Sequence, residues 1–269
     1  MVRHGTIDEV SFSQVRLRAV AGLLAVFILT ACSASVDPTW QQLRDTGLLR
    51  VGLDASFPPF EYIAPDGSLV GLDVDLAREI GRRLELEPRF VANLPYDGLY
   101  DALKAERVDL VISALAVDPS RMGDYAYSRA YFDAGHVLVS RTGEQVVESM
   151  SELGGRRLAV VLGTEGDLVG RRWARRLKDL AVVQYRTPDR ALSAVENEEA
   201  DIALVDHVSA LAVVGEAGDL DIVGEPVTEV PYACAMRRES VHLLQAVNRA
   251  LAAMEDDGTM DALIAKWLR

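Results

Sequence analysis

The sequence predicts an α/β protein of two lobes, each built on a mostly parallel sheet with helices on both faces, joined by a hinge of two crossover strands. Short apolar runs alternate with amphipathic helical segments, a pattern typical of β-α-β units. The pattern occurs twice: residues 102–113 and 194–205 both read as helix, acidic turn, aspartate and apolar strand. The 269 residues suffice for one large core or two modest ones.

The N-terminal segment, residues 1–31, has the pattern of a secretory signal. Three arginines precede an apolar run over 19–31 that is too short to span a bilayer comfortably. The run ends in Leu-Thr-Ala before Cys32, an ending that resembles a bacterial lipobox. We therefore expect Cys32 to carry a lipid anchor and 32–46 to form a tether. A plain signal peptide with an incidental cysteine and an uncleaved anchor helix remain as alternatives.

The first lobe is expected to comprise residues 47–138 and 232–269. Apolar residues recur at four-residue spacing from Leu72, which predicts a helix that Asp73 can cap. Gly81 lies inside this helix, where glycine costs helicity, so we expect close backbone packing there. Turn residues at 65–68 predict a hairpin. We expect strands at 48–53, 89–92 and 109–113, and helices at 73–86, 98–105, 240–254 and 258–268.

The second lobe is expected to comprise residues 139–231. Its apolar runs and helical segments follow the same order as those of the first lobe. The crossover strands are expected near 136–140 and 230–236. Within the lobe we expect strands at 157–162, 182–185 and 201–205, and helices at 167–177 and 191–196.

The net charge, the histidines and the cysteines argue against several functions. The net charge of −13 opposes nucleic-acid binding, because an acidic surface repels phosphates. The four histidines show no metal-ligand spacing, and we expect neither a metal nor a cofactor. With Cys32 acylated, Cys234 has no intramolecular partner, and its apolar surroundings favour a buried structural thiol over a nucleophile.

The ligand site is expected at the carboxyl ends of the strands, where open α/β sheets bind ligands. Facing lobes would bring both sets of strand ends to one cleft. The loops at those ends contain Arg121, Asp206, Phe57 and Tyr96. They offer a cation for a carboxylate, an anion for an ammonium and two aromatic faces, which suits an α-amino acid.

Residues 71–84 resemble the signature of the family-3 extracellular solute-binding proteins of bacterial ABC importers. The resemblance extends over the chain from about residue 40, through 56–61, 96–99, 109–113 and Arg121. It implies a type II periplasmic-binding-protein-like fold. It also implies a monomeric, non-enzymatic protein outside the cytoplasm, at the cell surface or in the periplasm, that passes a polar amino acid to a membrane permease.

The resemblance assigns roles to individual residues. Arg121 matches the arginine that binds the ligand carboxylate, and its planar fork can form two parallel bonds. Asp206 matches the carboxylate that receives the ammonium, and Phe57 and Tyr96 match the aromatics that enclose the side chain. Asp54 favours a polar ligand, basic or amide. The alternatives are a surface ion pair, a helix cap and ordinary core aromatics. These roles require Arg121 and Asp206 to face one shared cavity.

Two positions depart from the family pattern. Ala116 stands where a Ser or Thr hydroxyl usually helps to hold the ammonium, and the carbonyls of Ala114 or Ala116 could replace it. Ser113 and Thr164 are further expected ligand contacts, Thr164 at a helix N-terminus that should attract the ligand carboxylate. Glu165 puts a competing negative charge there. It either points away and favours the helix dipole, or lines the pocket and selects a cationic ligand.

Two other functional classes remain open. Some relatives resemble amino-acid dehydratases, in which a pocket carboxylate acts as general acid, and Glu165 is a candidate at an unusual offset. A ligand-sensing protein is the second alternative. Such chains usually continue into a membrane helix and an output domain, and this chain ends at Arg269.

Overall fold

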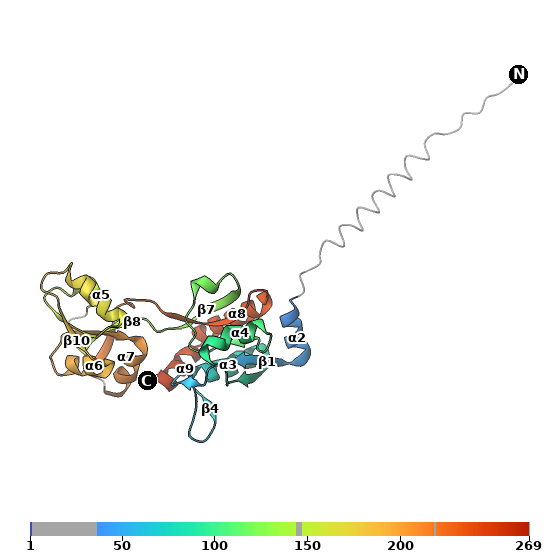
Figure 1. Cartoon of the computed structure of the whole chain (residues 1–269), viewed down its shortest axis with the longest axis horizontal. Helices are drawn as coiled ribbons and strands as arrows, with labels where there is room; N and C mark the ends of the chain where they lie inside the picture. Colours follow the sequence, from blue (N-terminus) through green and yellow to red (C-terminus); the bar gives the residue numbers. More distant parts are fainter. Residues whose placement is uncertain (2–36, 144–146, 218, 269) are drawn as a thin grey trace.

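The computed structural model describes Met1 and residues 37–143, 147–217 and 219–268. Two α/β lobes lie side by side and are joined by extended segments, as predicted (Figure 1). The expected signal segment and Cys32 lie outside the described residues. Among those residues, no helix combines the length and the apolar character needed to cross a membrane.

The first lobe contains a mixed five-stranded sheet in the order β5-β1-β6-β13-β7. Strand β1 is parallel to β5 and β6, whereas β13 is antiparallel to β6 and β7. A three-stranded sheet lies beside it, and its β3–β4 hairpin contains the turn expected at 65–68. The strands are β1 (Leu48–Gly52), β2 (Ser56–Phe57), β3 (Glu61–Ile63), β4 (Leu69–Val70), β5 (Glu87–Val91), β6 (Leu110–Val111), β7 (Tyr125–Asp133) and β13 (Pro231–Arg237).

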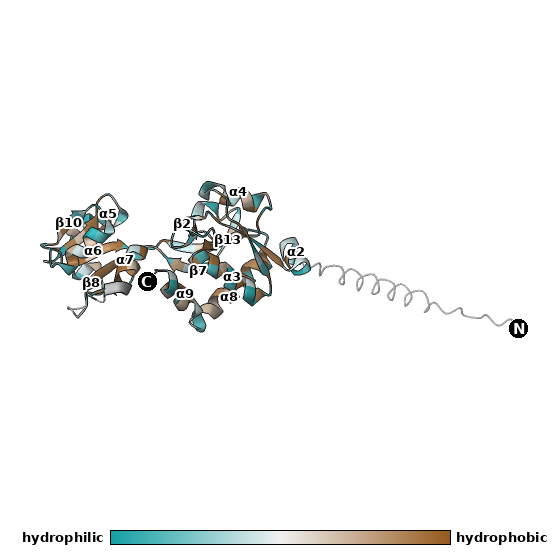
Figure 2. Cartoon of the chain, turned by 90° about the horizontal axis from the view of Figure 1, so that it is seen from below, coloured by the Kyte–Doolittle hydropathy of each residue, from teal (hydrophilic) through white to brown (hydrophobic). Residues whose placement is uncertain are grey.

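The helices of this lobe cover both faces of the sheet because its strands alternate apolar side chains. On β13, Cys234 and Met236 join the core beneath α3 and α8, whereas Ala235 joins the core beneath α4. Figure 2 shows the resulting pattern of apolar interior and polar outer surface. The helices are α2 (Pro38–Thr46), α3 (Leu72–Leu84), α4 (Leu99–Lys104), α8 (Val241–Asp256) and α9 (Thr259–Leu268), with short 3-10 turns at Tyr96–Gly98 and Pro119–Arg121.

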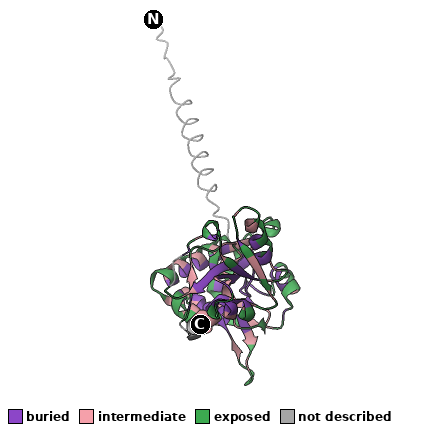
Figure 3. Ribbon diagram, turned by 90° about the vertical axis from the view of Figure 1, so that its left-hand side faces the viewer, coloured by how far each residue is buried: buried purple, intermediate pink, exposed green. Residues whose placement is uncertain are grey.

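The second lobe repeats this arrangement with its own sheet, in the order β10-β9-β11-β8-β12. Two parallel pairs are again followed by two antiparallel pairs. In the view along the long axis, in which the two lobes overlap, buried strands lie inside and exposed helix faces lie outside (Figure 3). The elements are β8 (His136–Arg141), η3 (Met150–Glu152), β9 (Arg157–Val161), α5 (Glu165–Ala174), β10 (Ala181–Tyr185), α6 (Pro188–Glu196), β11 (Ile202–Asp206), α7 (His207–Ala217) and β12 (Leu220–Val223).

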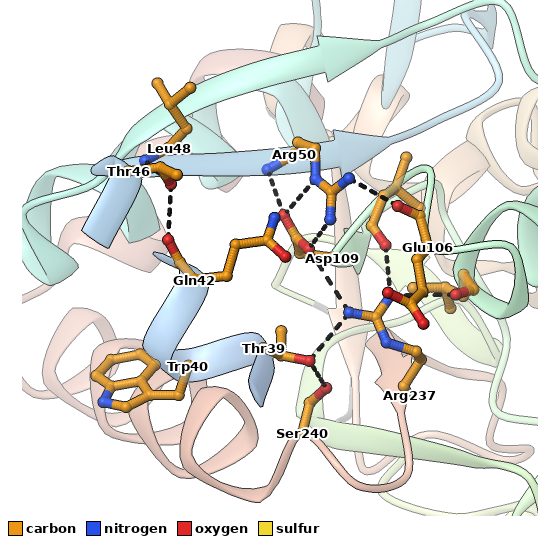
Figure 4. Close-up of polar contacts among 12 residues, drawn as sticks. Thr39, Trp40, Gln42, Thr46, Leu48, Arg50, Glu106, Asp109, Arg237 and Ser240 are labelled. Carbon is orange, nitrogen blue, oxygen red and sulfur yellow. Dashed lines mark hydrogen bonds and ion pairs between the residues drawn. The ribbon is translucent and has the colours of Figure 1, made fainter. Parts of the chain in front are cut away.

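The internal duplication extends to individual hydrogen bonds. On β1, Arg50 donates from its backbone N–H and its guanidinium to Asp109, and also to the carbonyl of Glu106 (Figure 4). On β9, Arg157 makes the same set of bonds to Asp201 and the carbonyl of Glu199. The aspartate that the sequence places before each third strand therefore ties that strand to the first strand of its lobe.

Several expectations about the elements need correction. The strands β7 and β12 were not anticipated, and α7 was foreseen only through the alternative that Asp206 caps a helix, because β12 is short and β7 and α7 lack a clear apolar period. Residues 136–138 belong to the second sheet, not to the first lobe as expected, and Pro231 belongs to the first. Asp73 does not cap α3: the N-cap is Gly71, without a side-chain bond. Asp73 is instead fully buried.

Two expectations about single residues are confirmed. Cys234 is a buried thiol, and burial raises its pKa to about 12, so it is not a reactive nucleophile. Gly81 is required by packing, because a Cβ there would lie 2.6 Å from the Cγ atom of Pro88. A larger residue would push α3 away from β5.

The duplicated ion pair gives a matched test of burial. Asp109 is 1% exposed and also lies 3.6 Å from Arg237, whereas the side chain of Asp201 is 24% exposed. Asp109→Asn should lower the free energy of unfolding by roughly 3 kcal/mol, since it leaves buried guanidinium charge uncompensated. Asp201→Asn should cost about 1 kcal/mol or less. Urea denaturation of both variants checks this, and equal losses would contradict it.

Candidate functional site

A cavity of about 290 Å³ opens on the first lobe at the carboxyl ends of β1 and β6. Five of the ten predicted ligand-contact residues line it, and they come from segments up to 60 residues apart in sequence. Three further lining residues were not predicted as contacts: Ser56, Glu61 and Tyr232. The lining residues are Asp54, Ser56, Phe57, Glu61, Tyr96, Ser113, Ala114 and Tyr232.

Asp54 is held at the cavity wall by bonds that leave it able to act on a ligand. Its carboxylate accepts from the Ser56 hydroxyl at 2.7 Å and from the Tyr96 backbone N–H at 3.0 Å. Its own N–H donates to Ser113 Oγ at 3.0 Å. Each carboxylate oxygen can accept more than one bond, so Asp54 retains capacity for a further donor.

The two predicted aromatic residues are unusually exposed for their type. Phe57 is 48% exposed and Tyr96 is 47% exposed. Phe57 is supported from beneath by Phe60, whose ring lies 5.7 Å away and nearly parallel. Because exposed aromatic surface is unfavourable in water, two such side chains around one cavity indicate a surface that a ligand covers.

Tyr232 forms another wall and was missed because it lies on the strand that returns from the second lobe. Burial raises its pKa to about 12, with contributions from nearby acidic groups on both lobes, including Asp73 and Asp206. The phenol therefore remains a neutral hydroxyl that can donate or accept. Its position in an apolar strand, Pro231–Arg237, gave no signal that it faced a ligand site.

The floor of the cavity is an unusual segment of backbone. Ala114 is buried and has φ of 41°, a conformation that a non-glycine residue adopts only under constraint. Its N–H donates to Asp73 Oδ2 at 2.5 Å, which supplies that constraint. Beside it, Ser113 Oγ donates to Glu61 Oε1 at 2.7 Å. The carboxyl groups of Asp73 and Glu61 thus define the floor.

Arg121 lies next to this cavity but does not line it. It lines an adjoining hollow of about 520 Å³ that shares Tyr96 as a wall and also includes Ala116. The guanidinium lies 4.3 Å from the ring centroid of Tyr100 and 3.3 Å from the carboxylate of Asp118. Arg121 is therefore half exposed and held by weak partners, so it can turn toward a ligand carboxylate at small cost.

In the second lobe, Thr164 is the N-cap of α5. Its hydroxyl donates to the Val161 carbonyl at 2.8 Å and accepts from the Asp167 N–H. The N–H groups of Gly163 and Gly166 are also used, by Asp167 and by the ring of His136. The expected anion site of free N–H groups is thus largely satisfied within the protein. Glu165 is exposed in the first turn and does not line the cavity.

Asp206 caps α7, the alternative that the sequence left open. Its two oxygens accept from the N–H and the hydroxyl of Ser209, at 2.9 and 2.8 Å. It does not line the cavity either, although its charge contributes to the raised pKa of Tyr232. Arg121 and Asp206 lie on different lobes, and neither lines this cavity, so the shared cavity that their expected roles require is not present in this structure. Of the cavity's walls, Tyr96 also lines the hollow that contains Arg121, and the charge of Asp206 helps to raise the pKa of Tyr232.

The hinge that separates the two halves is pinned by one side chain. Asp133 ends β7, and its Oδ1 accepts from the N–H groups of Gly135 and Val230, both at 2.8 Å. The two crossing segments approach so closely that a Cβ on Gly135 would lie 1.8 Å from the Thr228 carbonyl oxygen. Any movement of one lobe against the other has to act through this junction.

A second contact between the lobes lies beside the hinge. The ring of His207, at the start of α7, stacks on Phe132 at 5.1 Å and bonds through Nδ1 to the Asp133 carbonyl at 2.7 Å. Leu211 of α7 is buried in the core of the first lobe. His207 is therefore a structural histidine whose ring is stacked and hydrogen-bonded. The part of the chain that the structure describes holds no cluster of side chains suited to a metal ion.

Known proteins share sequence similarity with most of this chain. Residues 49–269 match the family of Bacterial extracellular solute-binding proteins, family 3. The chain is 30% identical over 258 residues to the L-cystine-binding protein TcyJ of Escherichia coli (strain K12), covering 93% of this chain and 94% of that protein. It is 31% identical to the Histidine-binding periplasmic protein of the same strain, covering 81% and 86%.

Among solved structures, the chain resembles the L-cystine solute receptor of Neisseria gonorrhoeae in its unliganded open conformation. The TM-score is 0.74 at 22% sequence identity, covering 85% of this chain and 95% of the receptor. This likeness supports the two-lobe type II periplasmic-binding-protein fold.

Asp133→Ala should weaken the hinge, because it leaves two backbone N–H groups without their acceptor. Each unmet buried donor costs about 1–3 kcal/mol, so the free energy of unfolding should fall measurably. Hydrogen exchange of the Gly135 and Val230 amides should accelerate more than exchange in β1. Asp133→Asn keeps one carbonyl oxygen as acceptor and is the control. Unchanged exchange at both amides in the alanine variant would contradict the assigned role.

Proposed function

Because this chain belongs to the family 3 bacterial extracellular solute-binding proteins, we propose that it captures a polar α-amino acid between its lobes and delivers it to an ABC importer. The family's members act outside the cytoplasm, and this protein binds its ligand there. It works as a binding component and catalyses no reaction on the ligand.

The observation that carries this proposal is the cavity with Phe57 and Tyr96 half exposed over Asp54. Two aromatic faces and one carboxylate suit the side chain of a small polar molecule better than an extended polymer. Arg121 next to one wall and Asp206 toward the other supply charges of opposite sign. An α-amino acid carries the complementary pair of charges on adjacent atoms.

Capture proceeds by closure about the hinge at Asp133. The ligand first meets the cavity of the first lobe, where its side chain packs between the aromatic rings. Arg121 then turns from Tyr100 to the α-carboxylate, which it can bind through two parallel charge-assisted bonds. Asp206 approaches the α-ammonium when the second lobe closes. Differential affinity of the ligand for the closed form drives the movement.

The ligand's side chain is polar, with a basic or amide group that reaches Asp54. Support comes from the carboxylate's capacity for another donor and from relatives named for histidine and cystine binding. Ala116 supplies no hydroxyl, so the carbonyls of Ala114 and Ala116 take part in holding the ammonium. Glu165, exposed in the first turn of α5, adds a negative charge that favours cationic ligands as they approach.

The protein is a monomer held at the membrane by a lipid on Cys32. The expected tether over 32–46 needs correction, because residues 38–46 form α2, which packs on the first lobe through the buried Leu43, so any tether ends before that helix. This part of the proposal rests on the sequence before Cys32 and on the lobes forming a complete fold from residue 38 onward. An acylated N-terminus keeps the loaded protein close to the permease.

Ligand binding should raise the melting temperature. A ligand at 100 times its Kd adds about 2.7 kcal/mol of stability, which corresponds to roughly 5–10 °C for a chain of this size. A thermal-shift screen against the twenty common amino acids and cystine should give such a rise for basic or amide-bearing ligands. Acidic and purely apolar amino acids serve as controls. No shift with any polar amino acid would contradict the proposed function.

Removing either end charge should weaken binding at least tenfold, since losing one partner of a desolvated charge pair costs about 2–5 kcal/mol. Arg121→Ala removes the carboxylate partner. Asp206→Asn removes the charge but keeps a residue that caps helices about as well, so α7 and the melting temperature should be preserved. Calorimetry measures both affinities. Arg129→Ala, which breaks only an exposed ion pair with Glu255, is the matched control. Unchanged affinity in either site variant would refute its assigned role.

A further inference from the structure

Two buried carboxyl groups lie side by side beneath the cavity. Glu61 is 1% exposed and Asp73 is fully buried. They come from different elements, β3 and α3, and lie within hydrogen-bonding reach of each other. Among the described residues, neither makes an ion pair with a cationic group.

The hydrogen bonds of the pair are unevenly distributed. Asp73 Oδ2 accepts two donors, the Ala114 N–H at 2.5 Å and the Tyr131 hydroxyl at 3.0 Å. Glu61 Oε1 accepts one, the Ser113 hydroxyl at 2.7 Å. The remaining oxygens, Glu61 Oε2 and Asp73 Oδ1, are buried and find no conventional donor in the described part of the chain. Two carboxylates could not leave both of these oxygens unpaired at such burial without a large desolvation cost.

We propose that Glu61 and Asp73 share one proton, so that the cavity floor carries one negative charge instead of two. The proton resides on Glu61 and is donated to Asp73. Asp73 remains the carboxylate because two donors already stabilise its charge. A single hydrogen bond between the two orphaned oxygens then satisfies both of them, and the floor becomes fully bonded.

The groups that face the pair favour retention of the proton. Burial, followed by the charge of Asp73, raises the pKa of Glu61 to about 10, and burial raises that of Asp73 to about 6. The negative charge of Asp54, across the cavity wall, also raises the pKa of Glu61. The other titratable groups facing the pair are neutral, because burial raises the pKa of each one: Tyr96, Tyr131, Tyr232 and Cys234.

The shared proton extends a chain of hydrogen bonds from the cavity wall to the hinge strand. It runs from the Asp54 N–H through Ser113 and Glu61 to Asp73, which receives the Tyr131 hydroxyl of β7. Under the proposed function, the ligand meets Asp54 as the charged group and Glu61 as a neutral donor and acceptor. That combination suits a side chain with one positive charge or an amide. The proton itself needs no ligand and can be tested without one.

The stability of the ligand-free protein should reveal the proton. An unfolded chain releases it near pH 4.5, whereas the folded protein keeps it to about pH 10. The folded state therefore binds more protons in this range, and stability falls as pH rises, by up to tenfold in the unfolding equilibrium constant per pH unit. Glu61→Gln cannot lose a proton, so its stability should fall less steeply between pH 7 and 9. Cys234 titrates alike in the wild type and in Glu61→Gln, so the difference between their slopes of stability against pH reports on Glu61.

Exposed Glu87, paired only with Arg89 at 3.1 Å, gives the control Glu87→Gln, which should keep the wild-type slope. Infrared spectroscopy supplies a readout that needs no variant. At pH 7 the wild-type protein should show the carbonyl band of a protonated carboxyl group, and ¹³C-labelled glutamate should shift that band. Parallel stability slopes for wild type and Glu61→Gln, or no glutamate-derived band at pH 7, would overturn the shared proton. Either result would leave the proposed ligand binding untouched.

Discussion

The carboxylate of Asp133 fixes the point about which the two lobes can move. It bonds to both segments that cross between the sheets, and Gly135 allows those segments to touch. The stacking of His207 on Phe132 and the burial of Leu211 hold the same side of the junction. With the lobes joined in this way, the remaining freedom is rotation of one lobe against the other about this junction.

This constraint explains why the site is divided. The first lobe alone offers a lined cavity, with aromatic walls, Asp54 and a floor built on Ala114. The charges suited to the two ends of an amino acid lie outside it, Arg121 resting on Tyr100 and Asp206 capping α7. The contacts of Arg121 cost little to exchange, and the carboxylate of Asp206 has room for another donor. Under the proposed function, the first lobe supplies a preformed pocket for the ligand's side chain, and closure about the hinge brings Arg121 and Asp206 to the ligand.

Much of the fold could be predicted from the sequence because local pattern and fold agree. Paired runs such as 102–113 and 194–205 gave the duplicated units, and the structure repeats them down to the Arg50–Asp109 and Arg157–Asp201 bonds. The lining of the cavity was predictable where a residue lies in a loop after a strand, as Asp54 and Tyr96 do. Prediction failed where burial overrode local preference. Asp73 looked like a helix cap, yet its carboxylate accepts hydrogen bonds from Ala114 and Tyr131, which lie far along the chain. Tyr232 and Glu61 reach the cavity through tertiary contacts that no spacing reveals.

In the proposed binding mode, one guanidinium and one carboxylate, now on separate lobes, bind opposite ends of the same small molecule. A crystal structure with the amino acid that stabilises the protein most tests it directly. We expect closed lobes, with the ligand's α-carboxylate paired to Arg121 and its α-ammonium within hydrogen-bonding distance of Asp206. A ligand bound to the first lobe alone, with Arg121 still resting on Tyr100 and Asp206 bonded only to Ser209, would contradict it.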